Sequence, residues 1–540
     1  MTEPAAGDSG RDASPTANTV GAVDEPPSSA VERGESTTAY LTAAVVAVVL
    51  VALPFLAVKM PPSTDLPQQV AQLRLLEEAL DDPGSPYRVQ WLAPNKLGLL
   101  PLWVASWWVS DPVDVGRLGL VLIATAWAMA LAWVAKVRRR GSWAPLVAML
   151  FFFSHALNWG LLNHLVGLPV FLFWWCTLER LWQEGQRTPT PILLRLGVAG
   201  LLLYAAHILW LAAGLLTLGV HALGTRWPSR RWVLASLALA PTAILVALWY
   251  PTLVVGGFDS VTAWGGGPWF RLHPGWLINS ALGGLQGSLE TWLLGGVIAW
   301  CALALWQNRG SALGADRRLL VVGAGFLLAA LVLPNVFQRT VFFASRWLPV
   351  AAVFAVLAMP SPRLAGSLRT VVGALLLASL TIPTTATWQE HESEELAGLD
   401  KALAALPENP RLLGLDFVRT SERVQGFPFY HLYVWGQVRR GGEVARSFAN
   451  EASSLVVYRD LPRDLPWTEG LDWTAHQVRR SDIPHFSHVL VQGTPETLGR
   501  MLSDPRLVPV TPPNRWTLLE VRPAPPVVEP PQPSAEPGTS

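Results

Sequence analysis

Residues 40–382 alternate between long apolar runs and short polar connections. The first run, 40–58, has no charged side chain, and its 19 residues suffice to cross the hydrocarbon core of a bilayer as a helix. Ten further runs follow at 118–135, 143–157, 161–178, 192–206, 208–223, 232–254, 292–306, 319–333, 341–358 and 364–382. The pattern predicts a polytopic α-helical membrane protein with about 11 transmembrane helices, in a domain spanning 39–383.

The segment between the first two runs, 59–115, also shows helical periodicity. Apolar side chains fall on one face and polar side chains on the other: Leu66, Val70, Leu73, Leu76 and Leu80 against Gln69, Gln72 and Glu77. This spacing predicts an amphipathic helix over 64–80, lying on the membrane. The apolar stretch 97–109 is short and contains Pro101, so it is expected to lie in the interface rather than to span. Loop 59–115 is thus predicted to hold juxtamembrane helices.

Basic residues set the expected orientation, because cytoplasmic connections of membrane proteins are enriched in lysine and arginine. The connection 136–140 holds four bases and no acid, and arginines recur in alternate connections: Arg226, Arg230, Arg231, Arg309, Arg317, Arg318, Arg363 and Arg369. With these connections inside, residues 1–38 are cytoplasmic, while loop 59–115 and everything after 383 lie outside. We expect an integral protein of the inner or plasma membrane.

The periodicity changes after residue 383. Leucines at helical spacing indicate a helix over 396–406, and 494–502 reads as another helix. Short β-branched and apolar runs predict strands at 411–418, 454–458, 488–492 and 516–521. Residues 384–522 are therefore expected to form an extracytoplasmic α/β domain. The glycine-containing basic segment 436–448 is interpreted as a turn rather than as a phosphate-binding loop.

Composition agrees with this class of protein. The chain of 540 residues is 51% hydrophobic and 15% charged, with a net charge of +1 that implies no nucleic-acid partner. Its two cysteines, Cys176 and Cys301, lie in apolar runs without metal-ligand spacing, so no metal site is predicted from them, although a divalent metal cofactor is left open. The first 36 residues lack a basic segment ahead of an apolar core, so the first run is expected to stay as an anchor. Segments 1–38 and 523–540 are expected to be disordered.

Two residues of the outer loop carry candidate chemistry. Asp65 follows the first span closely, where a carboxylate beside the membrane could accept a proton from a hydroxyl. The alternative is that Thr64 or Asp65 caps the helix that follows, with Pro67 in its first turn. Asn95 and Lys96 precede the apolar stretch 97–109, where a cation and helix N–H groups could bind an anion. The alternative for Lys96 is an unspecific contact with lipid headgroups.

Further polar residues are expected near the outer ends of spans, where ionisable groups indicate function. They are His155, Asn158, His164, His207, Arg339 and Arg346. For the histidines, the alternative is an ordinary hydrogen bond between helices. For Arg346, beside Trp347 in an apolar run, a phosphate suits the guanidinium fork, and a lipid headgroup is the alternative. Under the expected topology, all of these groups share one side of the membrane with Asp65 and Lys96.

This order of features resembles the GT-C superfamily of membrane glycosyltransferases, such as lipid A aminoarabinose transferases and protein O-mannosyltransferases. It comprises one span, an outer loop with an early acid in Thr64-Asp65-Leu66-Pro67, juxtamembrane helices with Asn95-Lys96-Leu97, many spans and an outer C-terminal domain. The chain departs from these relatives at Gln68-Gln69, where many carry a second acid or a histidine after the first acid. It also lacks the Pro-Pro that follows the lysine in several of them.

The resemblance implies transfer of a sugar from a polyprenyl-phosphate donor to an extracytoplasmic glycan, lipid or protein. Asp65 would be the catalytic base, and Lys96, Arg346 and Arg339 would bind the donor phosphate. Asn95, His155, Asn158, His164 and His207 would be polar residues of the substrate site. Two other classes stay open from the residues alone: a lipid or polysaccharide transporter or flippase, and a non-catalytic envelope assembly protein.

Overall fold

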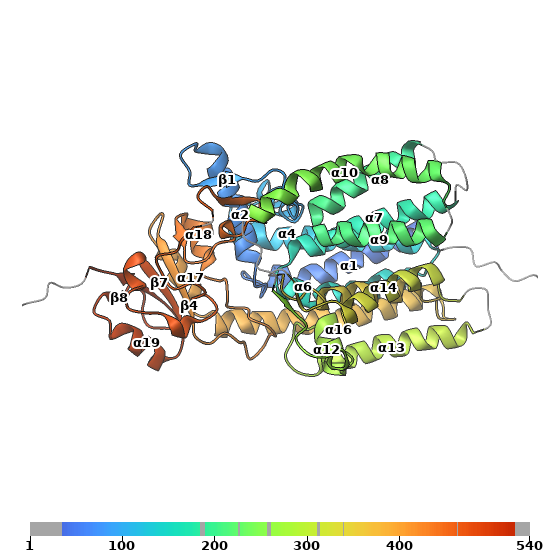
Figure 1. The fold of residues 1–540 in the computed structure, drawn as a ribbon. Coiled ribbons are helices and arrows are strands. Elements are labelled where there is room, and N and C mark those ends of the chain that lie inside the picture. Colours follow the sequence, from blue (N-terminus) through green and yellow to red (C-terminus); the bar gives the residue numbers. More distant parts are fainter. Residues whose placement is uncertain are drawn as a thin grey trace, which may run out of the picture.

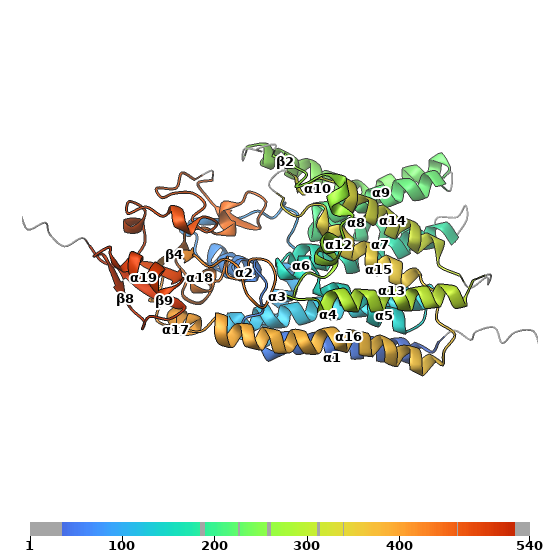
Figure 2. The same ribbon diagram turned by 90° about the horizontal axis from the view of Figure 1, so that it is seen from below.

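The computed structural model describes residues 35–183, 190–224, 227–255, 261–309, 314–337, 340–461 and 463–523. A bundle of long helices occupies one part of the molecule, and most of the strands gather in a C-terminal region beyond one end of that bundle (Figure 1). Helix α16 runs along the bundle and leads directly into the C-terminal region (Figures 1 and 2). That region comprises residues 399–523.

The longer helices of the bundle are α1 (Thr37–Ala57), α4 (Pro112–Val137), α7 (Leu162–Gln183), α8 (Thr190–Ala206), α9 (Ile208–Gly224), α10 (Ser229–Val255), α13 (Leu289–Gln307), α14 (Arg317–Val332), α15 (Leu348–Ala358) and α16 (Gly366–Glu390). Shorter helical elements join them: α5 (Trp143–Ala148), η1 (Met149–Phe153), α6 (His155–Asn158), α11 (Pro268–Arg271), α12 (Pro274–Ala281) and η2 (Ser345–Trp347). A π-helical turn, η3 (His391–Glu395), follows α16.

Each predicted apolar run contains a helix. Within the described ranges, five helices are long and apolar enough to cross a membrane: Thr37–Ala57, Pro112–Val137, Arg230–Thr252, Leu289–Gln307 and Gly366–Glu395. Shorter apolar helices cover Trp143–Phe153, Thr190–Ala206, Ile208–Gly224 and Ser345–Ala358. The chain is therefore a helical membrane protein with a C-terminal sheet region, and the count of 11 crossings stays a prediction.

Helix α1 packs between α4 and α16, so the ends of the helical part of the chain lie side by side (Figure 2). One side of α1, which is apolar all round, is buried here. Phe55 near its end stacks on Phe153 at a centroid distance of 6.1 Å and meets the edge of Trp388 at 5.3 Å. Burial of such large rings is a main source of stability in packed helices. It fixes the point at which the chain leaves α1 and enters the outer loop.

Charged side chains pair at the end of the bundle away from the C-terminal region. Arg138, just after α4, contacts Glu179 of α7 at 3.1 Å and Asp316 at 2.6 Å, and Arg318 of α14 contacts Glu179 at 2.6 Å. The bases that were predicted to lie inside thus include a paired group at this end. Which face of a membrane this end meets stays a prediction.

Residues 59–115, the predicted outer loop, hold two helices, α2 (Leu66–Asp81) and α3 (Leu99–Ser106), where the sequence predicts juxtamembrane helices. Helix α3 lies against α4, where Leu102 occupies the space that a Cβ at Gly119 would need. Three tryptophans in and just after α3 stay exposed: Trp103, Trp107 and Trp108. Exposed tryptophans at this level are typical of a membrane interface.

Part of the polar side of α2 is buried. Gln68 and Gln72 are buried because the C-terminal region covers them. The Gln72 amide donates to the carbonyl of Val456 at 3.1 Å and accepts from its N–H at 2.9 Å, and Gln68 forms the same kind of pair with Arg446 and Phe448. Helix α2 is thus held between the membrane helices and the C-terminal region.

The C-terminal region contains a five-stranded sheet in the order β5-β4-β7-β9-β8. The strands are β4 (Arg411–Asp416), β5 (Glu443–Val444), β7 (His488–Gln492), β8 (Leu507–Pro509) and β9 (Trp516–Val521). Its helices are α17 (Leu399–Ala404), α18 (Val434–Arg440) and α19 (Pro495–Leu502), with short turns η4 (Phe448–Asn450), η5 (Ala475–Gln477) and η6 (Ile483–His485). Strands β5 and β7 run parallel to β4, whereas β9 is antiparallel to β7 and β8.

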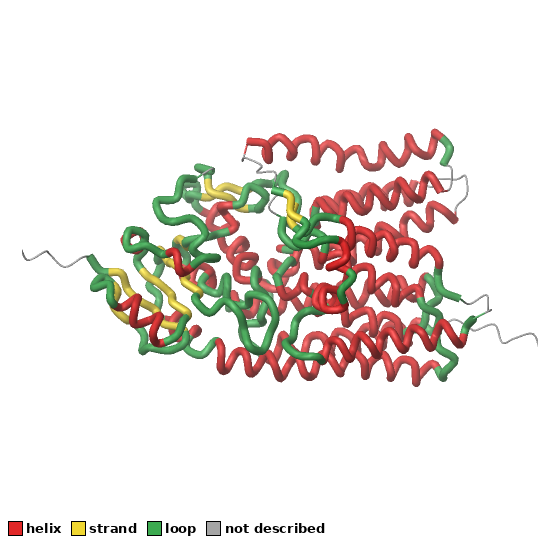
Figure 3. The backbone as a smooth tube through the Cα atoms, turned by 60° about the horizontal axis from the view of Figure 1, so that its bottom comes forward, coloured by secondary structure: helices red, strands yellow, loops and turns green. Residues whose placement is uncertain are grey.

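Two differences from the predicted secondary structure concern this region. The run 436–448 is not a single turn, since its first residues complete α18 before Gly441 and Gly442 turn the chain with positive φ. The run 454–458 does form a strand, β6 (Val456–Tyr458), but outside the five-stranded sheet. It pairs instead with β1 (Tyr87–Val89) of the outer loop, so that loop and C-terminal region share a two-stranded sheet (Figure 3). A second small pair, β2 (Thr262–Ala263) with β3 (Val336–Phe337), joins two connections of the bundle.

Candidate active site

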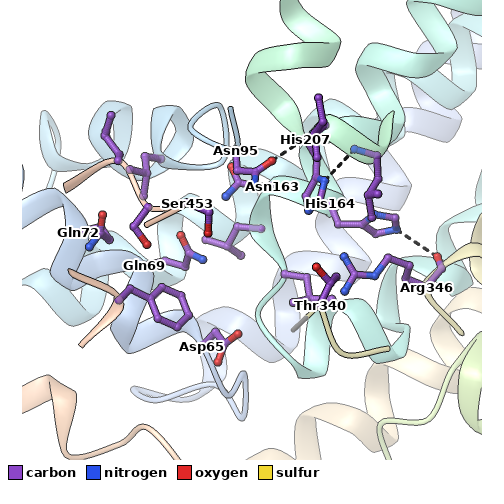
Figure 4. Close-up of a pocket in the computed structure, with 18 of the residues that line it drawn as sticks. Asp65, Gln69, Gln72, Asn95, Asn163, His164, His207, Thr340, Arg346 and Ser453 are labelled. Carbon is purple, nitrogen blue, oxygen red and sulfur yellow. Dashed lines mark hydrogen bonds between the residues drawn. The ribbon is translucent and has the colours of Figure 1, made fainter. Parts of the chain in front are cut away.

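A cavity of about 870 Å³ lies where the bundle meets the outer loop and the C-terminal region (Figure 4). Its walls come from α2, the start of α7, the junction of α8 and α9, the end of α10, the segment before η2 and the stretch that ends at β6. The polar lining residues are Asp65, Gln69, Gln72, Asn95, Asn163, His164, His207, Thr340, Arg346, Ser453 and Ser454. Five of the predicted site residues thus meet on one cavity: Asp65, Asn95, His164, His207 and Arg346.

Asp65 is held at the start of α2 by its backbone. Its N–H donates to the Trp159 carbonyl at 3.1 Å, and the preceding N–H of Thr64 donates to Asn158 at 2.9 Å. The turn that supplies these carbonyls approaches so closely that a Cβ on Gly160, where φ is +71°, would lie 2.8 Å from the nitrogens of Asp65 and Leu66. Only glycine combines that conformation with that approach.

The carboxylate of Asp65 does not cap α2, although the residue stands at the N-cap position. The Thr64 hydroxyl does not cap it either, because it donates to the carbonyls of Asn158 and Phe427. The capping interpretation is therefore wrong for the side chain. Instead, Oδ1 of Asp65 accepts a hydrogen bond from Nδ1 of His431 at 2.9 Å. The Asp65 side chain keeps 14% of its surface exposed, against 5% for His431.

His431 was not among the predicted site residues. It follows β4 in the C-terminal region, 366 positions from Asp65, and its ring contacts Tyr430 at 4.0 Å and Phe448 at 5.9 Å. Donation from Nδ1 leaves the opposite ring nitrogen as the acceptor in the neutral imidazole. The only signal in the sequence was a histidine inside an aromatic run, FPFYHLYVW, which lacks a recognisable motif. Its pairing with Asp65 depends on how the C-terminal region docks.

Arg346 supplies the cationic side of the cavity. Its Nε donates to the Phe342 carbonyl at 3.1 Å and one terminal nitrogen donates to Val341 at 2.6 Å, so the backbone orients the fork. The side chain is buried, and in the described ranges no carboxylate forms an ion pair with it. A buried cation needs a compensating anion or strong hydrogen bonds. Figure 4 shows Arg346 and Asp65 at the same cavity, from different elements.

Histidines and amides connect Arg346 to the outer loop. His164 donates from Nε2 to the Arg346 carbonyl at 3.1 Å and stacks on Trp210 at 5.2 Å. His207 accepts the N–H of Leu209 on Nδ1 at 3.1 Å, while Asn95 accepts the N–H of Ile208 at 3.2 Å. Asn163 accepts the N–H of Gly98 at 2.7 Å. These bonds fix the cavity wall opposite α2.

The other predicted residues lie away from the cavity lining. His155 is packed against Phe342 at 4.3 Å, and the Asn158 amide donates to the Gly283 carbonyl at 2.9 Å. The Lys96 ammonium donates to the Trp91 carbonyl, and partial burial lowers the pKa of Lys96. Its place in phosphate binding stays a prediction. Arg339 lies outside the described residues.

The described ranges contain no group of three or more His, Cys, Asp or Glu side chains placed to hold a metal ion. A second cavity, of about 610 Å³, adjoins the first and shares Leu209 and Phe343 with it. Apolar side chains of α7, α9 and α14 line most of it, among them Leu216, Val321 and Phe326. The two cavities together offer a polar chamber beside an apolar groove in the helical bundle.

No protein-family model matches the sequence, and no curated protein matches it. Among solved structures, the chain is similar to the crystal structure of ArnT from Cupriavidus metallidurans bound to undecaprenyl phosphate. The TM-score is 0.48 and the identity 10%, over 89% of this chain and 97% of that one. ArnT is a lipid A aminoarabinose transferase of the GT-C superfamily, the group that the sequence resembles. At 10% identity, the residues of the cavity rather than the likeness indicate the chemistry of this chain.

Proposed function

We propose that this protein is a GT-C-like membrane glycosyltransferase that moves a sugar from a polyprenyl-phosphate donor to an extracytoplasmic acceptor. The observation that carries the proposal is the pairing of two groups on one cavity. Asp65 presents a carboxylate, and Arg346 presents a buried guanidinium that no carboxylate of the described ranges neutralises. A base and an anion-binding cation on one cavity are the two groups that transfer from a phosphate leaving group requires.

In the proposed reaction, Asp65 accepts the proton of an acceptor hydroxyl. The oxygen then attacks the anomeric carbon of the donor sugar, forming the new glycosidic bond. The bond from that carbon to the phosphate oxygen breaks, and its electron pair leaves with the polyprenyl phosphate. Arg346 stabilises the negative charge that develops on the phosphate, and its backbone contacts hold it in place before the reaction.

The apolar groove supports a lipid carrier rather than a soluble sugar phosphate. It adjoins the polar cavity at Leu209 and Phe343 and runs between α7, α9 and α14 toward Arg318. A phosphate bound at Arg346 would place its isoprenoid chain at the mouth of this groove. Burial of each methylene there contributes about 0.8 kcal/mol to binding.

The test is a transfer assay with purified protein in nanodiscs and a panel of polyprenyl-phosphate-linked pentoses and hexoses. Asp65→Asn keeps the shape of the side chain and removes its basicity, so transfer is expected to fall by roughly 10²–10⁴-fold. The matched control is Asp111→Asn in the same outer loop. Asp111 caps α4 by accepting the N–H of Val113 at 2.8 Å, and asparagine caps equally well.

Full transfer by folded Asp65→Asn protein would remove Asp65 from the mechanism. Wild-type protein that transfers no sugar but moves polyprenyl phosphate between leaflets would favour a transporter instead.

A further inference from the structure

An aromatic cluster lies beside Asp65, outside the residues that line the cavity. Tyr430, next to His431, packs on Trp473 with ring centroids 4.1 Å apart. Trp473 in turn meets Phe427 at 5.7 Å and stacks on Trp159 at 6.3 Å. The Trp159 carbonyl accepts the N–H of Asp65, so the cluster includes a residue that is hydrogen-bonded to the proposed base.

Arg419 lies over this cluster. Its guanidinium carbon is 5.2 Å from the ring centre of Phe427 and 5.8 Å from that of Trp473. All three side chains are half-buried. In the described ranges, no carboxylate forms an ion pair with Arg419 and no hydrogen bond of its guanidinium occurs. The cation is therefore oriented by aromatic faces, while its N–H donors stay available to a ligand.

The backbone at Arg419 is held in an unfavourable conformation. Its φ is +62°, which is rare for a residue other than glycine, asparagine or aspartate. Asp416, at the end of β4, accepts the N–H groups of Val418 at 3.1 Å and Arg419 at 2.8 Å and so stabilises the turn. Strain of this kind is concentrated at functional sites.

The turn also lies where ligands usually bind. It follows β4, which runs parallel to β5 and β7, and the carboxyl ends of parallel strands are the common site of ligand binding in open α/β sheets. The same connection delivers Phe427 and His431. The connection that carries these residues thus reaches Asp65, since His431 bonds to its carboxylate.

We infer that Arg419, Trp473 and Phe427 form a binding subsite for an anionic saccharide. The Trp473 indole stays partly exposed beside Arg419 and can contact a sugar ring there, while the guanidinium provides donors for a carboxylate or a phosphate on that sugar. That this saccharide is the acceptor rests on the proposed function, because the cluster borders the residue proposed to activate the acceptor hydroxyl. The binding preference itself does not depend on transfer.

The experiment measures binding of three disaccharides to the full chain in nanodiscs: cellobiose, cellobiouronic acid and cellobiose 6′-phosphate. Wild-type protein is expected to bind at least one anionic disaccharide about tenfold more tightly than cellobiose, as one charge-assisted contact would give. Preference for the uronate or for the phosphate identifies the anionic group. Trp473→Ala should weaken all three, because the stacking face is lost.

Arg419→Asn tests the cation with little risk to the fold, since asparagine tolerates positive φ. It should abolish the anionic preference and leave cellobiose binding unchanged. The matched control is Arg515→Asn, since Arg515 also lies over an aromatic ring, that of Phe429 at 6.0 Å, but away from Asp65. Wild-type protein without anionic preference, or equal losses in the two asparagine variants, would overturn the subsite.

The experiments distinguish a failure of the proposed transfer mechanism from a failure of the saccharide subsite. Asp65→Asn should keep the preference for the anionic disaccharide while transfer is lost. Transfer that survives in Asp65→Asn contradicts the proposed mechanism but not the subsite. Transfer that depends on Asp65 without any anionic preference contradicts the subsite alone.

Discussion

At the scale of single residues, replacing Arg346 should affect the binding of polyprenyl phosphate much more than the stability of the fold. Its buried charge lacks an ion-pair partner in the described ranges, so removing it relieves a desolvation cost. Its loss also frees the carbonyls of Phe342 and Val341, so we expect Arg346→Met to change the melting temperature little, while the affinity for polyprenyl phosphate falls by about tenfold or more. Thermal melting and lipid binding in the same nanodisc preparation measure both effects.

Arg271→Met is the matched control for this prediction. Arg346 donates to two backbone carbonyls, whereas the similarly buried Arg271 donates to four, those of Ala330, Leu331, Leu333 and Trp264. Its loss leaves those carbonyls without a donor and should lower the melting temperature. An Arg346→Met protein that destabilises like Arg271→Met would show that Arg346 is structural.

His431 acts through Asp65 and is therefore a positioning residue. Its 2.9 Å bond to Oδ1 fixes the direction of the carboxylate. We expect His431→Ala to lower kcat by roughly 10²-fold with little change in the donor KM, because a misplaced base affects the chemical step. His431→Asn, whose amide nitrogen can take the place of Nδ1, should recover part of the rate.

Exposed His476 in the same region provides a control, and His476→Ala should be neutral. A purely structural role for His431 would instead lower stability in both variants without rescue by asparagine.

At the scale of elements, the start of α2 depends on Gly160. A Cβ there would lie 2.8 Å from the nitrogens of Asp65 and Leu66, and alanine would also be strained at a φ of +71°. Gly160→Ala is therefore expected to destabilise the protein by roughly 1 kcal/mol or more and to displace Asp65. Transfer should fall even in protein that remains folded.

Gly219→Ala in α9 is the control, because nothing lies within 4 Å of its added Cβ. It should be neutral or slightly stabilising, since alanine favours helices. Equal transfer by the two variants would show that the approach of Gly160 does not position Asp65.

Strand β4 ends in a titratable group, since burial raises the pKa of Asp416 to about 6, against the lowering effect of its bonds to Val418 and Arg419. The folded state therefore binds this proton more tightly than the unfolded state does. Its contribution to stability is complete below about pH 4 and is lost as the pH rises through about 6, by roughly 3 kcal/mol in all. The melting temperature should fall across this window.

Asp416→Asn should remove that dependence and melt at a higher temperature than the wild type at pH 7.5. Its amide oxygen can still accept the two N–H groups. Identical pH profiles for wild type and variant would contradict the raised pKa.

The elements show what sequence patterns can and cannot predict. Periodicity predicted α2 and the strands at 488–492 and 516–521, because the spacing of apolar side chains is a local property. It could not predict that Gln68 and Gln72 are buried. In a sequence, a glutamine that hydrogen-bonds to a distant backbone segment cannot be distinguished from one that hydrogen-bonds to water. For the same reason, the pattern predicts a strand at 454–458 but not its partner, which is 87–89 of the loop after α1.

At the scale of the whole molecule, the site depends on segments that are far apart in the sequence. The outer loop packs its helix on α18 and its strand on β6, and this docking brings His431 to Asp65. Convergence of Asp65, His164, His207 and Arg346 could be predicted from alternating spans, since alternate connections share a face. The contribution of the C-terminal region could not, because no local pattern encodes an interface between separate parts of a chain.

The most direct test of the account is a structure of the full protein with polyprenyl phosphate bound in nanodiscs. The phosphate should lie at the guanidinium of Arg346 with its isoprenoid chain entering the groove between α9 and α14, and the Asp65 carboxylate should face the position of the sugar. A phosphate bound at the opposite end of the bundle, among Arg138 and Arg318, or one separated from Asp65 by packed side chains, would contradict the proposed enzyme.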